Sequence, residues 1–277
     1  MKADCHMHMI LDGDFWRTAI ARHDPKPDEI FIHKVLGIYR QLGYTYLRDG
    51  GDRWGAGKRA REIAPEYGII YRTPLAPLCR AGHYGAFIGL QYENLREYAQ
   101  LVKRQKAEGA DFIKIMISGL MDFDRFGVLT ESGQDPGEIW ELIHIAHEEG
   151  MAVMAHANGA RTVEAAAAAG LDSVEHGAYL DEDALAAMTE NGTVWVPTLS
   201  TIGNLRGKGR FSEEAVQAIL ASALENLSAY KGLVAAGTDA GAWSVPHGSS
   251  TEEPLLATAG IGPNRLEEGR NIIVKKF

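Results

Sequence analysis

The chain contains only two cysteines, Cys5 and Cys79, among its 277 residues. A disulfide framework of the kind that stabilises small secreted domains is therefore excluded, and a reducing, cytoplasmic location is the expectation. Basic residues are also scarce, since 28 lysines and arginines against 37 aspartates and glutamates give a net charge of −9. This balance argues against nucleic acid or an anionic membrane surface as a partner.

Long hydrophobic runs are missing too, because no apolar stretch approaches the roughly 20 residues that a membrane-spanning helix needs. The chain starts almost directly with a strand-like run, so we expect no targeting segment and no membrane partner. The composition, 45% apolar and 23% charged, is ordinary for a globular domain. A length of 277 residues suits one large α/β domain, and we expect residues 1–277 to form a single domain.

Short strand-like runs alternate with longer amphipathic runs along the chain. The predicted strands are 3–10, 44–49, 69–76, 112–118, 151–157, 173–176, 193–199 and 232–238. The predicted helices are 28–42, 57–67, 94–108, 136–149, 160–169, 181–190 and 212–230, most of them followed by glycine. Repeated βα units of this kind predict a (β/α)8 barrel. An open doubly wound sheet is the alternative, but no glycine-rich phosphate turn follows the first strand.

Potential metal ligands stand at the ends of these strands. His6 and His8 are one residue apart in the first strand, and because strand side chains alternate, both imidazoles point to the same face. Further candidate ligands follow in or at the ends of later strands: Lys114, His156, His176 and Asp239. Active sites of such barrels form where the strands end, so all six groups can meet at one mouth.

The residue types suit a metal centre. Neutral imidazoles and a carboxylate are ordinary ligands of zinc and related divalent metals. Lys114 is unusual, because a buried ammonium is costly unless it is paired or modified. A neutral amine there can react with CO2 to give an anionic carbamate. Taken singly, a salt-bridged lysine, satisfied core histidines and a capping carboxylate are equally good or better interpretations; the six together favour a site.

Six short stretches carry a resemblance to a known family: DCHMH at 4–8, YTYLRDGG at 44–51, IKIMISG at 113–119, AHANG at 155–159, SVEHG at 173–177 and GTDAG at 237–241. In this order they resemble the amidohydrolase superfamily, especially its imidazolonepropionase-like and prolidase-like branch. The resemblance implies a (β/α)8 barrel with a one- or two-metal centre, here expected to hold two zinc ions.

The resemblance also implies a role for each ligand. His6 and His8 would bind the more buried metal, and Lys114, as a carbamate, would bridge both metals. The two later histidines, His156 and His176, would bind the more exposed metal. Asp239 would contact the buried metal and move the proton as general base and then general acid.

Two departures from the family pattern are visible. Many relatives carry a small β-sandwich built from sequence before the first strand and after the eighth, and we expect it to be lacking here. Loss of that sandwich would leave an apolar patch favouring a homo-oligomer. Relatives often have a second histidine near position 158, where this chain has Asn158.

The expected activity is hydrolysis of a small-molecule amide or cyclic amide, of the dipeptide or N-acyl amino acid type. Candidate substrate-binding residues in the strand-end loops are His83, Tyr84, Tyr179, Thr198 and Trp243. The alternatives are a mononuclear deaminase, a lactone or phosphotriester hydrolase, and a catalytically silent metal-binding scaffold. Lys114 argues against the mononuclear deaminase, because a one-metal site needs no bridging carbamate. Asp239 argues against the silent scaffold, because a structural site needs no proton shuttle.

Overall fold

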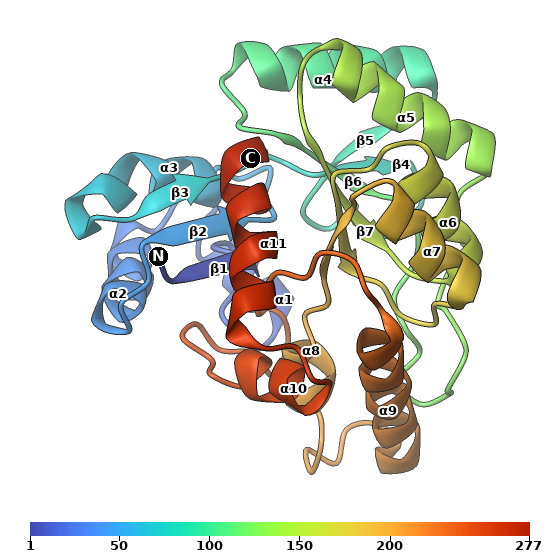
Figure 1. Cartoon of the computed structure of the whole chain (residues 1–277). Coiled ribbons are helices and arrows are strands. Elements are labelled where there is room, and N and C mark those ends of the chain that lie inside the picture. The colour runs from blue at the N-terminus through green and yellow to red at the C-terminus, as the bar shows by residue number, and fades with distance from the viewer.

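Helices and short parallel strands alternate throughout the computed structural model, which describes residues 1–277 (Figure 1). The strands are β1 (Ala3–Met7), β2 (Tyr46–Asp49), β3 (Ile70–Arg72), β4 (Leu78–Arg80), β5 (Leu90–Tyr92), β6 (Ile113–Met116), β7 (Val153–Ala157), β8 (Ser173–His176) and β9 (Val194–Val196). The α-helices are α1 (Trp16–Ala21), α2 (Glu29–Gln41), α3 (Ala56–Ile63), α4 (Leu95–Ala107), α5 (Pro136–Glu148), α6 (Ala160–Ala168), α7 (Glu182–Glu190), α8 (Ser200–Gly203), α9 (Glu213–Ala229), α10 (Glu252–Thr258) and α11 (Pro263–Lys276), with a 3-10 turn η1 (Ala64–Tyr67) after α3.

The strands form two hydrogen-bonded sheets, in the orders β1-β2-β3 and β5-β4-β6-β7-β8-β9. Segment 233–240 lies between β9 and β1: the Trp195 N–H donates to the Leu233 carbonyl at 2.9 Å, and the Asp239 N–H donates to the His6 carbonyl at 2.7 Å. On the other side, β3 continues through 73–77 into β4, which pairs with β6. The strands therefore follow one another in the predicted order of a TIM-type (β/α)8 barrel. All pairings between the named strands are parallel, so these residues contain no accessory β-sandwich.

Two predicted strands differ from the observed ones. The eighth, 232–238, makes only an isolated bridge at Val234, and Ala240 just beyond it makes another, instead of a continuous ladder. The backbones approach closely there, since a Cβ on Gly237 would lie 2.8 Å from the His6 nitrogen. The third, 69–76, ends at Arg72 because two prolines and a left-handed Leu75 (φ 66°) follow. Strands β4 and β5 were not predicted.

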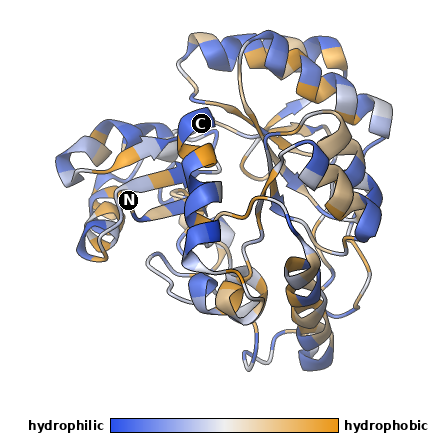
Figure 2. Cartoon of the chain, in the orientation of Figure 1, coloured by the Kyte–Doolittle hydropathy of each residue, from blue (hydrophilic) through white to orange (hydrophobic).

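The predicted helices are all present, and polar caps explain where several begin. The side chains of Asp28, Asn94 and Asp181 each accept a hydrogen bond from the backbone N–H three residues later. Four helices were not predicted: α1, α8, α10 and α11. In Figure 2, hydrophobic and hydrophilic residues share the outer helices, as expected for helices that cover a barrel. No helix combines the length and hydropathy that crossing a membrane requires.

The last helix covers one end of the barrel. Helix α11 contacts β1 and β9, and the final residue, Phe277, is buried against Phe112 with ring centroids 5.2 Å apart. The Phe277 ring also stacks on the guanidinium of Arg48, at 4.5 Å, inside the barrel. Phe112 directly precedes β6, and the Arg48 side chain points from β2 into the barrel. The cluster around Phe277 therefore fills the end of the barrel opposite the carboxyl ends of the strands.

Candidate active site

Three of the predicted ligands, His6, His8 and Asp239, lie within contact distance of each other. His6 is in β1 and His8 follows it directly, and their Nε2 atoms are 3.3 Å apart. The Oδ1 atom of Asp239 lies 3.5 Å from His6 Nε2 and 3.3 Å from His8 Nε2. One ligand atom from each residue fits within a span of 4.8 Å, which suits a single cation.

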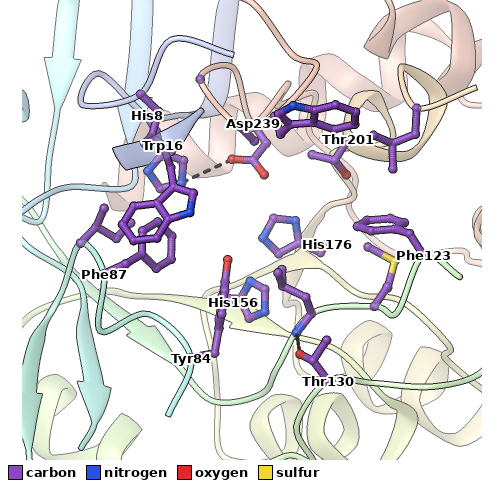
Figure 3. Close-up of a pocket in the computed structure, with 18 of the residues that line it drawn as sticks. His8, Trp16, Tyr84, Phe87, Phe123, Thr130, His156, His176, Thr201 and Asp239 are labelled. Atoms are coloured by element: carbon purple, nitrogen blue, oxygen red, sulfur yellow. Dashed lines mark hydrogen bonds and ion pairs between the residues drawn. The ribbon is translucent and has the colours of Figure 1, made fainter. Parts of the chain in front are cut away.

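The other three predicted ligands border this group. His156 and His176 end β7 and β8, with ring centroids 4.6 Å apart, and the His176 ring is 5.2 Å from that of His6. Lys114, in the middle of β6, is buried and its Nζ has no hydrogen-bond partner. All six residues line one cavity of about 620 Å³ (Figure 3). The structure thus brings together the whole ligand set that the sequence predicted.

Strained backbone turns two of the predicted ligands into this cavity. His176 ends β8 and Asp239 lies in segment 233–240, and they have left-handed φ values of 70° and 56°. Thr198, which lies behind His176, also has a left-handed φ, of 50°. Such a conformation costs roughly 1–3 kcal/mol for residues other than glycine, so the surrounding packing must hold it. Local strain of this kind is common where side chains are positioned for chemistry.

Burial keeps the four histidines neutral. Desolvation, followed by the nearby charge of Lys114, lowers the pKa of His8 and of His156 to about 3. Desolvation is also the main cause that holds the pKa values of His6 and His176 well below the usual range. A neutral imidazole has a free lone pair, which is the form that binds a metal.

Lys114 and Asp239 are the two groups of the site that carry opposite charges. Burial lowers the pKa of Lys114 to about 8 and raises that of Asp239 to about 8, and in each case the charge of the other group opposes the shift. A divalent cation between them would favour the carboxylate and the unprotonated amine.

A buried network fixes the orientation of His6. Its Nδ1 lies 2.7 Å from Oε2 of Glu175, so the proton sits on Nδ1 and Nε2 faces Asp239. The other Glu175 oxygen accepts hydrogen bonds from Arg48 Nη2 at 2.8 Å and from Ser173 Oγ at 2.6 Å. The Glu175 and Arg48 side chains have no exposed surface. In β8, side chains two residues apart face the same way, so Ser173 and Glu175 both point into the barrel. This alternation is visible in the sequence, but the sequence analysis gave Glu175 no role.

The remaining ligands also have partners behind them. His176 Nδ1 lies 2.7 Å from the Thr198 hydroxyl, and His156 Nε2 lies 3.1 Å from the Gly119 carbonyl. Asp4 accepts hydrogen bonds from the Thr238 N–H and hydroxyl, at 2.9 and 2.6 Å, immediately before Asp239. These contacts leave one ring nitrogen of each histidine available to a metal.

Of the five predicted substrate-binding residues, Tyr84 and Trp243 line the cavity. Thr198 is buried behind His176, which it hydrogen-bonds. The His83 side chain is 47% exposed, 3.3 Å from Glu131, and does not line the cavity. Tyr179 also lies outside the lining, against Phe126. The cavity has further aromatic residues that sequence reasoning missed, because loops lack periodicity: Phe15, Trp16, Phe87, Phe123 and Phe211.

Three polar atoms of the predicted ligands are buried without a partner. His8 Nδ1, Lys114 Nζ and Asp239 Oδ1 are all buried and make no hydrogen bond. Such atoms are costly in a protein interior unless something compensates them. Nitrogen and carboxylate donors converging in this way fit a divalent metal such as zinc.

Comparison with known proteins shows which enzymes the chain is similar to. No family model matches it. Ochratoxinase of Aspergillus niger is 27% identical over 305 residues, which cover 95% of this chain and 61% of the relative. The crystal structure of that ochratoxinase is 25% identical and superposes with a TM-score of 0.76, over 96% of this chain and 68% of the other. The chain thus resembles the amidohydrolases, as its sequence motifs predicted.

One further solved structure and one further sequence extend this similarity. A Xaa-Pro dipeptidase solved with bound methionine superposes with a TM-score of 0.77 at 21% identity, over 99% of this chain and 75% of the other. An uncharacterised protein of Mycobacterium tuberculosis is 30% identical over 195 residues, covering 67% of this chain and 51% of that protein. The predicted prolidase-like relationship is thus confirmed. The chain spans about 61% of the length of ochratoxinase.

Proposed function

We propose that this chain is a metal-dependent hydrolase that cleaves an amide bond of a small molecule of the dipeptide or N-acyl amino acid type. The observation that carries the proposal is the meeting of four neutral imidazoles, one carboxylate and one unpaired lysine at the wall of a single cavity. The relatives support the reaction class, because ochratoxinase and a Xaa-Pro dipeptidase are named as hydrolytic enzymes.

The predicted ligands form two groups, each of which would bind one metal. His6, His8 and Asp239 would hold one divalent metal, and His156 with His176 would hold a second, with Lys114 between them. When bound, the metals would act as Lewis acids on the amide carbonyl and lower the pKa of water to about 7.

Lys114 suits the bridging position as a carbamate. Its unprotonated amine would form an N–C bond to CO2 and release a proton to water, giving an anion where a buried ammonium has no partner. The resulting oxygens would supply one ligand to each metal position.

Asp239 suits the role of proton carrier. Its Oδ1 has no hydrogen bond in the protein and lies beside both histidines of β1. The carboxylate would take the proton of the attacking water and deliver it to the nitrogen of the departing amine. Thr238, fixed by Asp4, holds the backbone that presents this carboxylate.

Elemental analysis and an amide screen test the proposal together. Protein purified without chelator, from cells grown with bicarbonate, should carry about two metals per chain, and Lys114→Ala should carry about one or none. Asp239→Asn should lose roughly a hundredfold or more in kcat. His144→Ala, which changes a half-buried histidine on α5 outside the cavity lining, is the matched control and should resemble the parent. A metal-free parent that hydrolyses no amide would refute the proposal.

A further inference from the structure

A buried acidic residue outside the cavity holds the turn that follows β9. Glu252 begins α10 and is 2% exposed. Its Oε1 accepts a hydrogen bond from the Leu199 N–H at 3.0 Å, and its Oε2 accepts two, from the N–H and the hydroxyl of Ser200, at 2.7 and 2.8 Å. Burial raises the pKa of Glu252 to about 8, and these hydrogen bonds oppose that rise because they favour the carboxylate. Both oxygens therefore serve one turn that is far from Glu252 in sequence.

The residue before this turn has a strained backbone. Thr198 is fully buried and has a φ of 50°, which a β-branched residue rarely adopts. Such a conformation persists only where the surrounding structure holds it. Glu252 binds the next two N–H groups along the chain, and the Thr201 hydroxyl donates to the Thr198 carbonyl at 2.8 Å. The contacts of Glu252 therefore help to hold Thr198 in its strained conformation.

The Thr198 hydroxyl in turn orients a predicted metal ligand. Its Oγ1 lies 2.7 Å from His176 Nδ1, and this is the only hydrogen bond of the imidazole. The Trp195 indole N–H donates to the His176 carbonyl at 2.9 Å, so the backbone of His176 is held separately from its ring. With Nδ1 occupied, Nε2 is the nitrogen left for a metal. The direction of the His176 ring therefore depends on where Thr198 holds its hydroxyl.

Glu252 also joins two loops that contribute to the cavity lining. Helix α8 follows β9 and α10 follows segment 233–240, and the two helices contact each other (Figure 1). The Asn204 side-chain amide of the first loop donates to the Ser244 carbonyl of the second at 2.9 Å. The hydrogen bonds of Glu252 reach the backbone directly after Thr198, so they carry this connection closest to the ligands.

We infer, resting on the proposed function, that Glu252 is a positioning residue for the metal position that includes His176. It neither lines the cavity nor contacts a predicted ligand. It acts by fixing the turn after Thr198, so that the Thr198 hydroxyl holds the His176 ring with Nε2 toward the metal. The other metal position does not depend on this turn, because Glu175 orients His6.

Metal affinity tests this dependence. Glu252→Gln keeps the size of the side chain but turns an NH2 group toward a backbone donor, so the turn loses a hydrogen bond. Zinc titration in competition with a fluorescent chelator should show one of the two sites weakened about tenfold or more and the other unchanged within about twofold. Glu253→Gln, an exposed change at the next position, is the control and should bind zinc as the parent does. An equal weakening of both sites, or of neither, would overturn the inference.

The imidazole tautomers give a readout that needs neither a bound metal nor a substrate. In chelator-treated protein, long-range proton–nitrogen correlation spectra report which ring nitrogen carries the proton. We expect the proton of His176 on Nδ1 in the parent and on a mixture of both nitrogens in Glu252→Gln, whereas His6, held by Glu175, should not change. A parent that binds no metal would refute the proposed function and leave this measurement valid. An unchanged His176 signal, or an equal change at both histidines, would overturn the inference.

A second pair of variants tests the route through Thr198 with Glu252 in place, and it serves also if Glu252→Gln does not fold. Thr198→Val removes the hydroxyl but keeps the shape, and it should mix the His176 tautomers and weaken one zinc site as Glu252→Gln does. Thr198→Ser keeps the hydroxyl and should behave as the parent. A Thr198→Val protein with the parent's His176 signal would exclude this route.

Discussion

At the scale of single residues, the predicted ligands are held in place by buried side chains that would not bind the metal themselves. Glu175 bridges His6 and the buried Arg48, and its loss would release the imidazole while leaving a charge without a partner. Removing one partner of a buried pair usually costs about 3–5 kcal/mol of stability, whereas carboxylates behind metal-binding histidines affect affinity by about 10–100-fold.

Glu175→Gln is therefore expected to weaken metal binding about tenfold or more, and also to lower the melting temperature. Metal affinity would be measured by competition with a fluorescent chelator, and stability by thermal unfolding of metal-free protein. A variant that unfolds earlier yet binds metal as the parent does would show that Glu175 only supports the fold.

Gly50 offers a second test at this scale. A Cβ at this position would clash with Cε1 of His8, so Gly50→Ala must displace the ring. We expect reduced metal content by elemental analysis with little change in circular dichroism. Gly262→Ala, where a Cβ meets nothing within 4 Å, is the matched control and should keep its metal. Full metal content in Gly50→Ala would contradict the assignment of His8.

At the scale of elements, the sequence predicted the strands that carry the ligands, because period-two alternation and helix-ending glycines are local signals. It did not predict the break after β3 or the irregular eighth strand, since both depend on close backbone contacts such as that of Gly237 with His6. The ligand set was predictable because each member ends or occupies a strand. The aromatic lining was not, because its position depends on loop conformations without periodicity.

Asp172 joins three elements at the end of the barrel away from the ligands. It accepts hydrogen bonds from His147 of α5 at 2.9 Å, from Lys276 of α11 at 2.6 Å and from the Val153 N–H of β7 at 2.8 Å. Although burial alone would raise it, these hydrogen bonds hold the pKa of Asp172 below its usual 3.8.

Because the folded pKa is depressed, the stabilisation by Asp172 is present above pH 3.8 and is lost as the pH falls through the folded value. Asp172→Asn should therefore lower the free energy of unfolding by about 1 kcal/mol at neutral pH, a modest value because His147 and Lys276 are partly exposed. Urea unfolding at several pH values would measure it. A difference between parent and variant that stayed constant below pH 3.8 would exclude this account.

At the scale of the whole molecule, a bound metal would join distant parts of the chain. His8 and Asp239 come from the first and last strand segments of the barrel, so an ion that they share links parts of the chain that are far apart in sequence. Binding to the folded state alone stabilises it by about 2.7 kcal/mol when the free ligand is a hundred times its Kd.

Chelator treatment should therefore lower the melting temperature by several degrees, and added zinc should restore it. Scanning calorimetry would measure the melting temperatures of the parent and of His8→Ala after each treatment. The melting temperature of the variant should change less in both cases. Identical responses from the two proteins would place the stabilising metal elsewhere.

Two tryptophans of the cavity lining can report on a bound molecule by their fluorescence. Trp16 and Trp243 line the cavity, whereas the other three tryptophans, Trp54, Trp140 and Trp195, lie outside its lining. With one of the two cavity indoles replaced by phenylalanine, a change of emission on binding reports on the surroundings of the other. In a stopped-flow record, departure of the amine product and of the acid product would then appear as separate signals, giving the order of release directly.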